Sequence, residues 1–370
     1  MLTRPASAGR FYVIGKDTMT KLYVSPTAEP EGDGTLYRPF STIQGAQRAV
    51  RVLIAAGHDD DIVVYLRGGF YPITETLVFG TEDSFCFSGA DRTSSARSVT
   101  YIAFPDEQPI LSSGVPISGW EQENEEIPGL PKAAEGKLWS APLPMRNGKP
   151  IGVKTLYDGY RRMPRARTAG FSPPDDINPE DRKASELSVS TQVFDTIAYP
   201  EGAMRCYENL ADAELLVRPT HVWVMNLLPI AGIDEAKRIA RTTIPATYPM
   251  YKVAFREGFR TGEQSAWVEN VFDGITAPGK WVADTSRGRI YLWPRTANTI
   301  DTEGKPKEPA ESVYAPHLTE IIRVDGMDGD TPVENLFFEG LTFAHTERIT
   351  WDAKTVGLQH DWDLYDSPNA

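Results

Sequence analysis

Residues 318–346 read LTEIIRVDGMDGDTPVENLFFEGLTFAHT, and this stretch sets the expected architecture of the whole chain. Two short apolar strands, Ile321–Val324 and Leu336–Phe343, flank a turn rich in Asp, Gly and Pro. Such a strand pair resembles one coil of a parallel solenoid, which needs several stacked coils to close its core. No second copy follows before Ala370. We therefore expect an open last coil, either because the chain is a fragment of a longer protein or because other chains supply the missing coils.

The segment 22–120 shows a similar pattern of short strands, preceded by a helix. Ser41 is the expected N-cap, Gln44 completes a capping box, and Gly57 ends the helix. The apolar positions of this helix follow the 3.6-residue period, so one face is expected to be buried. An amphipathic helix at this place would cover the open first coil. The expected strands are residues 62–66, 76–79, 99–103 and 109–112.

The pattern changes between residues 121 and 310. Connections rich in Pro and Gly alternate there with aromatic strands at 222–228, 265–272 and 288–294, and with helix-like stretches at 184–195 and 233–241. This mixture predicts an inserted, β-rich domain. The predicted organisation is a leader at 1–21, a cap and first coils at 22–120, the inserted domain at 121–310, and a resumed, apparently truncated coil at 311–370.

Composition limits the partners. The 370 residues are 41% apolar and carry a net charge of −13, which opposes binding to nucleic acid and to anionic membranes. No apolar run is long enough for a membrane span, and Met1–Lys21 lacks the apolar region of a signal peptide. Cys86 and Cys206 lie among apolar neighbours, which favours buried free thiols over a disulfide. No cysteine or histidine spacing suggests a metal, and no cofactor is expected.

Six blocks of the chain resemble, in order, those of bacterial right-handed parallel β-helix glycoside hydrolases. The group they resemble most is glycoside hydrolase family one hundred and forty-one, which includes α-fucosidase and xylanase activities. The blocks are YVSPTAEPEGDGTLYRPFSTIQGAQRAVR (23–51), IVVYLRGGFYPITETLVF (62–79), VTYIAFPDEQPILSSGVPISGW (99–120), KTLYDGYRRMPRART (154–168), WVENVFDGITAPGKWVADTSRGRIYLWP (267–294) and PVENLFFEGLTFAHT (332–346).

This resemblance implies a mainly β fold: a right-handed parallel β-helix start with an N-terminal capping helix and an inserted β-rich domain. It also implies a polysaccharide or oligosaccharide substrate and a secreted or periplasmic location. Catalytic acids are implied on coils that follow the LFFEGLTF block, and these have no counterpart before Ala370. The resemblance therefore assigns no catalytic residue in this chain.

The tail WDAKTVGLQHDWDLYDSP, from residue 351, is the local candidate for a sugar site. Its tryptophans can stack on sugar faces, and its acids and histidine can bind hydroxyls or move protons. The alternative is a polar loop whose tryptophans pack over the edge of the solenoid. The candidate substrate-binding residues are Trp351, His360, Asp361 and Trp362, and the candidate catalytic residues are Asp361 and Asp363.

Two other clusters have simpler explanations. Arg161, Arg162, Arg165 and Arg167 could grip an anionic polysaccharide, but internal salt bridges are favoured in so acidic a chain. Asp325, Asp328 and Asp330 lack the spacing of a calcium loop and are expected in a turn. Asn335 is expected to adopt a left-handed corner.

Three functions stay open. The favoured one is a glycoside hydrolase acting on plant or algal cell-wall polysaccharide, which needs two carboxyl groups across the scissile bond. A polysaccharide lyase would instead need a basic proton acceptor near a neutralised uronate. A noncatalytic glycan-binding or surface module would need neither. A second chain, or self-association, is a further expected partner for the open coil.

Overall fold

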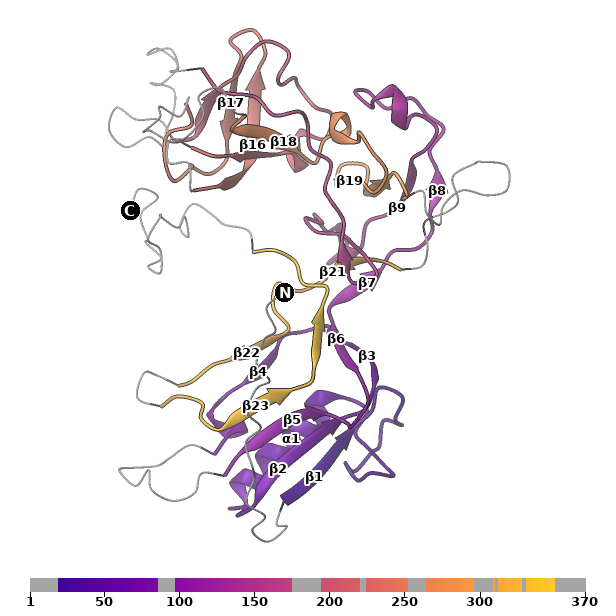
Figure 1. Cartoon of the computed structure of the whole chain (residues 1–370), viewed down its shortest axis with the longest axis vertical. Coiled ribbons are helices and arrows are strands. Elements are labelled where there is room, and N and C mark those ends of the chain that lie inside the picture. The colour runs from indigo at the N-terminus through magenta and orange to yellow at the C-terminus, as the bar shows by residue number, and fades with distance from the viewer. Residues whose placement is uncertain are drawn as a thin grey trace, which may run out of the picture. The chain divides into compact units, whose positions relative to one another are not determined.

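The computed structural model describes residues 19–85, 97–174, 194–219, 224–251, 264–295, 309, 312–327 and 331–349 (Figure 1). The fold is mainly β, with several sheets, none of them closed, and one α-helix among the described residues. Two compact units are present: Met1–Ser113 with Glu320–Ala344, and Gly114–Thr319 with His345–Ala370. The predicted segment boundaries at 120/121 and 310/311 stay predictions.

The first unit contains three parallel sheets. All pairings in them are parallel, as Figure 1 shows for the largest. The largest sheet has the order β1 (Met19–Val24), β2 (Asp61–Leu66), β5 (Val99–Ala103), β23 (Leu336–Glu339). The second sheet has the order β24 (Thr342–Ala344), β6 (Pro109–Ser112), β3 (Gly69–Pro72). The third sheet pairs β22 (Ile322–Val324) with β4 (Leu77–Phe79).

The chain visits these sheets in a fixed order, and we call each visit a pass. The first pass is β2, β3, β4; the second is β5, β6 and, after the second unit of the chain, β22; the third is β23 and β24. Residues 318–346, predicted to form one coil, contribute one strand to each of the three sheets, through β22, β23 and β24. β22 ends the second pass, and the predicted strand Leu336–Phe343 is two strands, because Gly340 (φ 68°) turns the chain between them.

Apolar side chains of successive passes stack inside the first unit. Tyr101 lies between Val64 and Phe338 in register, and its ring packs against those of Phe79 and Phe338 with centroids 5.2 and 5.7 Å apart. Ile62, Val64, Phe79 and Tyr101 are at most 1% exposed. These inward positions alternate with outward ones along each strand, as a half-buried strand requires.

The helix α1 (Ile43–Ala55) forms as predicted but begins one residue later than expected. Thr42, not Ser41, is its N-cap: the Thr42 hydroxyl accepts from the Gly45 amide at 3.1 Å. The buried face of α1 satisfies a strand edge, since Gln47 Nε2 donates to Val78 O of β4 at 2.7 Å. Arg51 also pairs with the fully buried Asp83 at 2.8 Å. The helix thus supplies hydrogen bonds to backbone that no strand pairs.

The second unit is built from antiparallel sheets. One has five strands and contains the largest described core, and two have four strands. The five-stranded sheet has the order β14 (Thr196–Ala198), β17 (Ile239–Thr242), β16 (Asn226–Asp234), β15 (Glu214–Val217), β18 (Ala266–Glu269). One four-stranded sheet has the order β19 (Trp281–Asp284), β20 (Arg289–Leu292), β9 (Trp139–Pro142), β8 (Glu121–Gln122), and the other has the order β13 (Arg161–Arg162), β12 (Tyr157–Asp158), β21 (Val313–Pro316), β7 (Gly114–Pro116). A separate hairpin pairs β10 (Met145–Arg146) with β11 (Lys149–Pro150).

Two sequence predictions fail in this unit. Residues 233–241, expected to be helical, form the turn and arms of the β16–β17 hairpin. Asp234 Oδ1 accepts from the Lys237 amide at 2.9 Å and Arg238 takes φ 57°, which together make a turn. Cys206, expected to be buried, is exposed. The other predicted helix, residues 184–195, lies largely outside the described residues, as does Cys86.

Candidate functional site

The site predicted from the sequence lies outside the described residues. Trp351, His360, Asp361, Trp362 and Asp363 all follow residue 349, the last described position. Asp328 and Asp330 of the predicted turn are also outside, while Asp325 donates its amide to Phe79 O at 2.9 Å. The predicted corner at Asn335 is confirmed, because its φ is 55° and its side-chain amide donates to Phe85 O at 3.0 Å.

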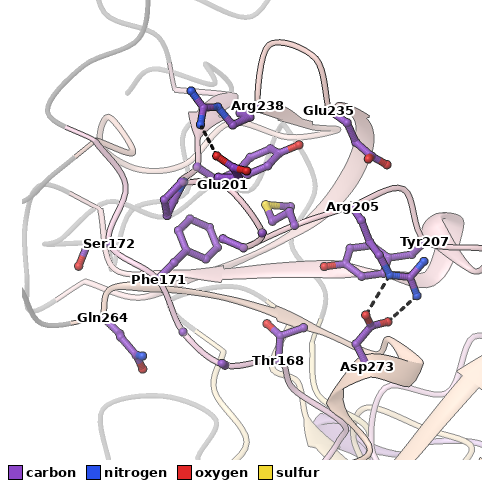
Figure 2. Close-up of a pocket in the computed structure, with 17 residues that line it drawn as sticks. Thr168, Phe171, Ser172, Glu201, Arg205, Tyr207, Glu235, Arg238, Gln264 and Asp273 are labelled. Carbon is purple, nitrogen blue, oxygen red and sulfur yellow. Dashed lines mark hydrogen bonds and ion pairs between the residues drawn. The ribbon is translucent and has the colours of Figure 1, made fainter. Parts of the chain in front are cut away.

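The structure presents a different candidate, a pocket of about 930 Å³ within the second unit (Figure 2). It is lined by the segment Thr168–Ser172, the turn after β14 and the β16–β17 turn. Gln264, two residues before β18, and Asp273, in the short helix η4 (Phe272–Gly274), also line it. Isolated bridges from Arg167 to Glu269 and from Phe171 to Ala266 hold the first of these segments against β18.

The floor of this pocket is aromatic and apolar. Phe171, Tyr199, Met204 and Tyr207 line it and also belong to the core of the five-stranded sheet, with 3–7% exposure. Burial raises the pKa of the Tyr207 phenol and that of Tyr199. Both phenols are thus neutral at pH 7 and can act as hydrogen-bond donors or acceptors.

One wall of the pocket is a fixed ion pair. Arg205 donates to both oxygens of Asp273, through Nε at 2.9 Å and Nη2 at 2.8 Å, as Figure 2 shows. Its remaining donors reach Cys206 O and Pro128 O at 3.2 and 3.3 Å. The hydrogen bonds that Arg205 donates to Asp273 raise the pKa of Arg205. Gly129 makes room for this arrangement, since a Cβ there would lie 1.8 Å from Arg205 Nη2.

The rim is polar and open. Glu201 and Arg238 form an ion pair at 3.8 Å, with side chains 93% and 53% exposed. Glu235 accepts from the Cys206 amide at 2.6 Å, and this hydrogen bond lowers the pKa of Glu235. Two arginines and three carboxylates leave the lining with one net negative charge.

This arrangement suits binding better than hydrolysis. A general acid for glycoside cleavage must stay protonated near neutral pH, which requires a raised pKa. The pKa of Glu235 moves the other way, and Asp273 is committed to Arg205. An aromatic floor with a few convergent polar groups is typical of a small-molecule site.

A second polar cluster is buried and internally neutralised. Glu214, 2% exposed, contacts Arg165 and lies 2.6 Å from Arg348 and 3.5 Å from Lys154. Arg167 pairs with Glu269 at 2.6 Å. The favoured interpretation of the basic cluster as internal salt bridges is thus confirmed for Arg165 and Arg167. Arg161 and Arg162 are exposed on β13.

The sequence contains little that would reveal the pocket. The stretch AYPEGAMRCYEN, residues 198–209, supplies much of its lining and mixes aromatic, glycine and charged residues as many surface loops do. Its partners, Thr168–Ser172, Glu235 and Asp273, are 26 or more residues away in the chain. The pairing of β16 with β15 and β17, the pairing of β15 with β18, and the bridges from Arg167 and Phe171 to β18 bring these segments together.

No protein-family model and no curated protein matches the chain. Solved structures do. One, described as "Glycoside hydrolase", has a TM-score of 0.64 and 23% identity, covering 89% of this chain and 51% of its own. Another, described as "The complex structure of XylC with xylose", has a TM-score of 0.33 and 13% identity, covering 91% and 37%. The chain therefore has a glycoside hydrolase-like fold, and it spans about half the length of the first of these structures.

Membrane insertion through a helix finds no support in the described ranges, where no helix combines the length and the apolar character that crossing a bilayer requires.

Proposed function

We propose that this chain is part of a carbohydrate-active protein, a glycoside hydrolase of the right-handed parallel β-helix type that acts on plant or algal cell-wall polysaccharide. The observation that carries the proposal is the likeness to the solved glycoside hydrolase over 89% of the chain. The six sequence blocks that resemble family one hundred and forty-one support the same assignment.

The three passes of the first unit support the β-helix part of the proposal. Their strands pair only in parallel among the described residues, and equivalent positions of successive passes lie in register, as at Val64, Tyr101 and Phe338. Parallel strands joined by crossovers are right-handed in nearly all proteins. On this view the passes are β-helix coils, and the second unit is an insertion within the second coil.

Catalysis needs two carboxyl groups facing one sugar. Coils repeat at roughly 4.8 Å, so acids one coil apart lie near the separation of about 5 Å that retaining enzymes use, and acids further apart approach the inverting range. Because the chain spans about half of the solved glycoside hydrolase, we propose that the catalytic acids lie on coils outside these 370 residues. A secreted or periplasmic location, where such polymers occur, is proposed from the same resemblance.

The proposal is tested by assaying the complete gene product and the 370-residue chain on neutral and acidic cell-wall polysaccharides. We expect the complete protein to release reducing sugar and the chain alone to release little. Ends absorbing as unsaturated sugars would identify a lyase instead, and binding without turnover in both would identify a noncatalytic module. If the chain alone were active and Asp361→Asn or Asp363→Asn abolished that activity, these aspartates would be the catalytic candidates.

The tail residues have a different expected role in the complete protein. Trp351 and the segment from His360 to Asp363 are proposed to bind sugar at the edge of the cleft. Trp351→Ala or Asp361→Ala should then raise KM more than it lowers kcat, because binding shared by substrate and transition state affects KM. A lower kcat with an unchanged KM in either variant would contradict this role.

A further inference from the structure

We propose that the pocket of the second unit, defined by Phe171, Tyr199, Tyr207, Arg205 and Asp273, binds a neutral oligosaccharide and does not take part in its cleavage. The ligand class rests on the proposed function. The site itself rests on the geometry below. Such a site in the inserted domain would hold the protein on its polysaccharide while other residues cleave that polysaccharide.

The size and floor of the pocket fit a sugar. A volume of about 930 Å³ lies at the upper end of the range of about 300–1,000 Å³ for small-molecule sites. Sugars present C–H faces that pack on apolar and aromatic surface. Phe171, Tyr199 and Tyr207 line the pocket with 3–7% of each residue exposed, and the Arg205 guanidinium lies over the Tyr207 ring at 5.3 Å, so they form a narrow apolar floor and not open stacking platforms. These rings are anchored in the core of the five-stranded sheet, so little side-chain entropy is lost when a ligand binds.

The polar groups complement hydroxyls, which both donate and accept. Gln264 supplies an amide with both kinds of group, Glu201 and Glu235 supply acceptors, and Arg238 supplies donors. Gln264 and Glu201 are exposed at the rim, where they can reach a bound chain without disturbing the core.

Charge argues against an acidic sugar. The lining carries one net negative charge, and the whole chain carries −13. Both arginines of the lining are already paired, Arg205 with Asp273 at 2.8 Å and Arg238 with Glu201 at 3.8 Å. A uronate would add a negative charge to this lining and compete with these carboxylates for the arginines, whereas a neutral sugar leaves both pairs intact.

The test is calorimetric titration of the 370-residue chain with xylohexaose, cellohexaose, mannohexaose and a fucosylated xyloglucan oligosaccharide, with a galacturonate hexamer as the acidic comparison. We expect at least one neutral oligosaccharide to bind and the galacturonate to bind more weakly. The double variant Glu201→Ala/Gln264→Ala should weaken binding about tenfold or more, since it removes two rim hydrogen-bonding groups. The control, Glu125→Ala, removes an exposed glutamate outside the pocket and should change nothing.

Thermal unfolding of each variant establishes that the fold is kept. Failure of all four neutral oligosaccharides to bind, tighter binding of the galacturonate, or unchanged affinity in the double variant would each overturn the inference. The proposed function fails separately, because it requires hydrolysis by the complete protein and does not depend on the affinity of this pocket. Hydrolysis by the complete protein without oligosaccharide binding at the pocket would reject only the proposed binding site. Binding at the pocket without hydrolysis would reject only the proposed hydrolase function.

Discussion

At the scale of single residues, Glu214 shows how charge is accommodated inside the second unit. It is 2% exposed and meets cations from three separate segments, those of Lys154, Arg165 and Arg348. Burial alone would raise the pKa of this carboxyl, but the three cations outweigh burial, with Arg165 contributing most, and lower it to about 2. The ionised form is therefore part of the folded state.

Replacing Glu214 by Gln should destabilise the protein by about 3–5 kcal/mol, because three cations lose their shared buried partner.

The pH dependence of the stability should change too. With a folded pKa of about 2 against an ordinary value of 4.5, the carboxylate contributes stability above pH 4.5 that is lost as pH falls toward 2. Urea unfolding between pH 6 and 3 should show a shallower decline in the variant. Glu125→Gln, at an exposed position, should follow the wild type, and an identical acid slope in Glu214→Gln would contradict the assignment.

His345 titrates in a separate pH range. Its Nε2 donates to Gly159 O at 2.8 Å, and its ring stacks on Tyr314 and Tyr160 with centroids 4.7 and 5.5 Å apart. Burial lowers the pKa of this imidazole below 6.5, and the hydrogen bond to Gly159 offsets only part of that shift. The neutral ring is the form that the fold stabilises.

As pH falls below 6.5, the unfolded chain should bind a proton at His345 before the folded chain does, so this residue should make stability decline with acid. His345→Phe keeps a ring but cannot titrate. We expect it to lose about 1–2 kcal/mol at pH 7.5, from the unpaired Gly159 carbonyl, and to decline less between pH 6.5 and 5. NMR titration of the ring measures the pKa directly. A pKa at or above 6.5, or parallel stability curves, would show that the prediction is wrong.

Residue type predicted some local structure and misled elsewhere. Asn335 was predictable as a left-handed corner because Asn tolerates positive φ better than most residues. Cys206 was not, because its apolar neighbours Met204 and Tyr207 point into the core while the chain between them turns outward. The apolar character of sequence neighbours therefore predicts the burial of a residue only when the helical or strand periodicity of that segment is known.

At the scale of elements, glycine corners define how the passes turn. Gly340 separates β23 from β24 with φ 68°, and a Cβ there would lie 3.0 Å from Ala103 Cβ. Gly57, after α1, has φ 76° and open space around the same position. The two glycines therefore share a backbone requirement and differ in packing.

Gly57→Ala should cost about 1–2 kcal/mol, the penalty of a left-handed conformation for an L side chain. Gly340→Ala should cost more, because Ala103 on the neighbouring pass must also shift. Chemical denaturation of both variants gives the comparison. Equal losses would mean that the strand pair relaxes freely around position 340.

Elements whose pattern is local were predicted well. Residues 99–103 and 109–112 were expected as strands and are β5 and β6, and the helix was displaced by only one capping residue. The β16–β17 hairpin was missed because IDEAKRIAR has helix-forming residues whose preference is overridden by pairing with β14 and β15. Likewise β23 and β24 look like one apolar run until each is paired with a different sheet.

At the scale of the whole molecule, the pairing of β4 with β22 joins strands more than 240 residues apart. Periodicity cannot reveal such a partner, so the pairing of β22 with β4 was not predictable from the sequence. The pocket is hidden for the same reason, since its lining comes from five separated segments. A mainly β organisation could be predicted because short apolar strands and turn residues are local features.

The last strands of two sheets, β22 in the second pass and β24 in the third, each leave an inward-facing apolar side chain uncovered by any residue that the structure describes. Val324 is in register with Phe79, and Phe343 with Leu111. Their partners in the preceding passes are at most 1% exposed, whereas Val324 and Phe343 are 51% and 48% exposed. The same positions that form the core of one pass therefore form an apolar surface on the next.

Such a surface should bind a hydrophobic dye or associate with a second copy, because exposed apolar patches beside unpaired strand edges are sticky. We expect the 370-residue chain to bind the dye and Val324→Ser/Phe343→Ser to reduce both dye binding and any self-association seen by sedimentation. Phe337→Ser is the matched control: Phe337 is 46% exposed on the same pass but pairs with Thr100 on the outward face, so its loss should matter less. Monomeric behaviour at high concentration without dye binding would instead mean that another part of the chain covers Val324 and Phe343.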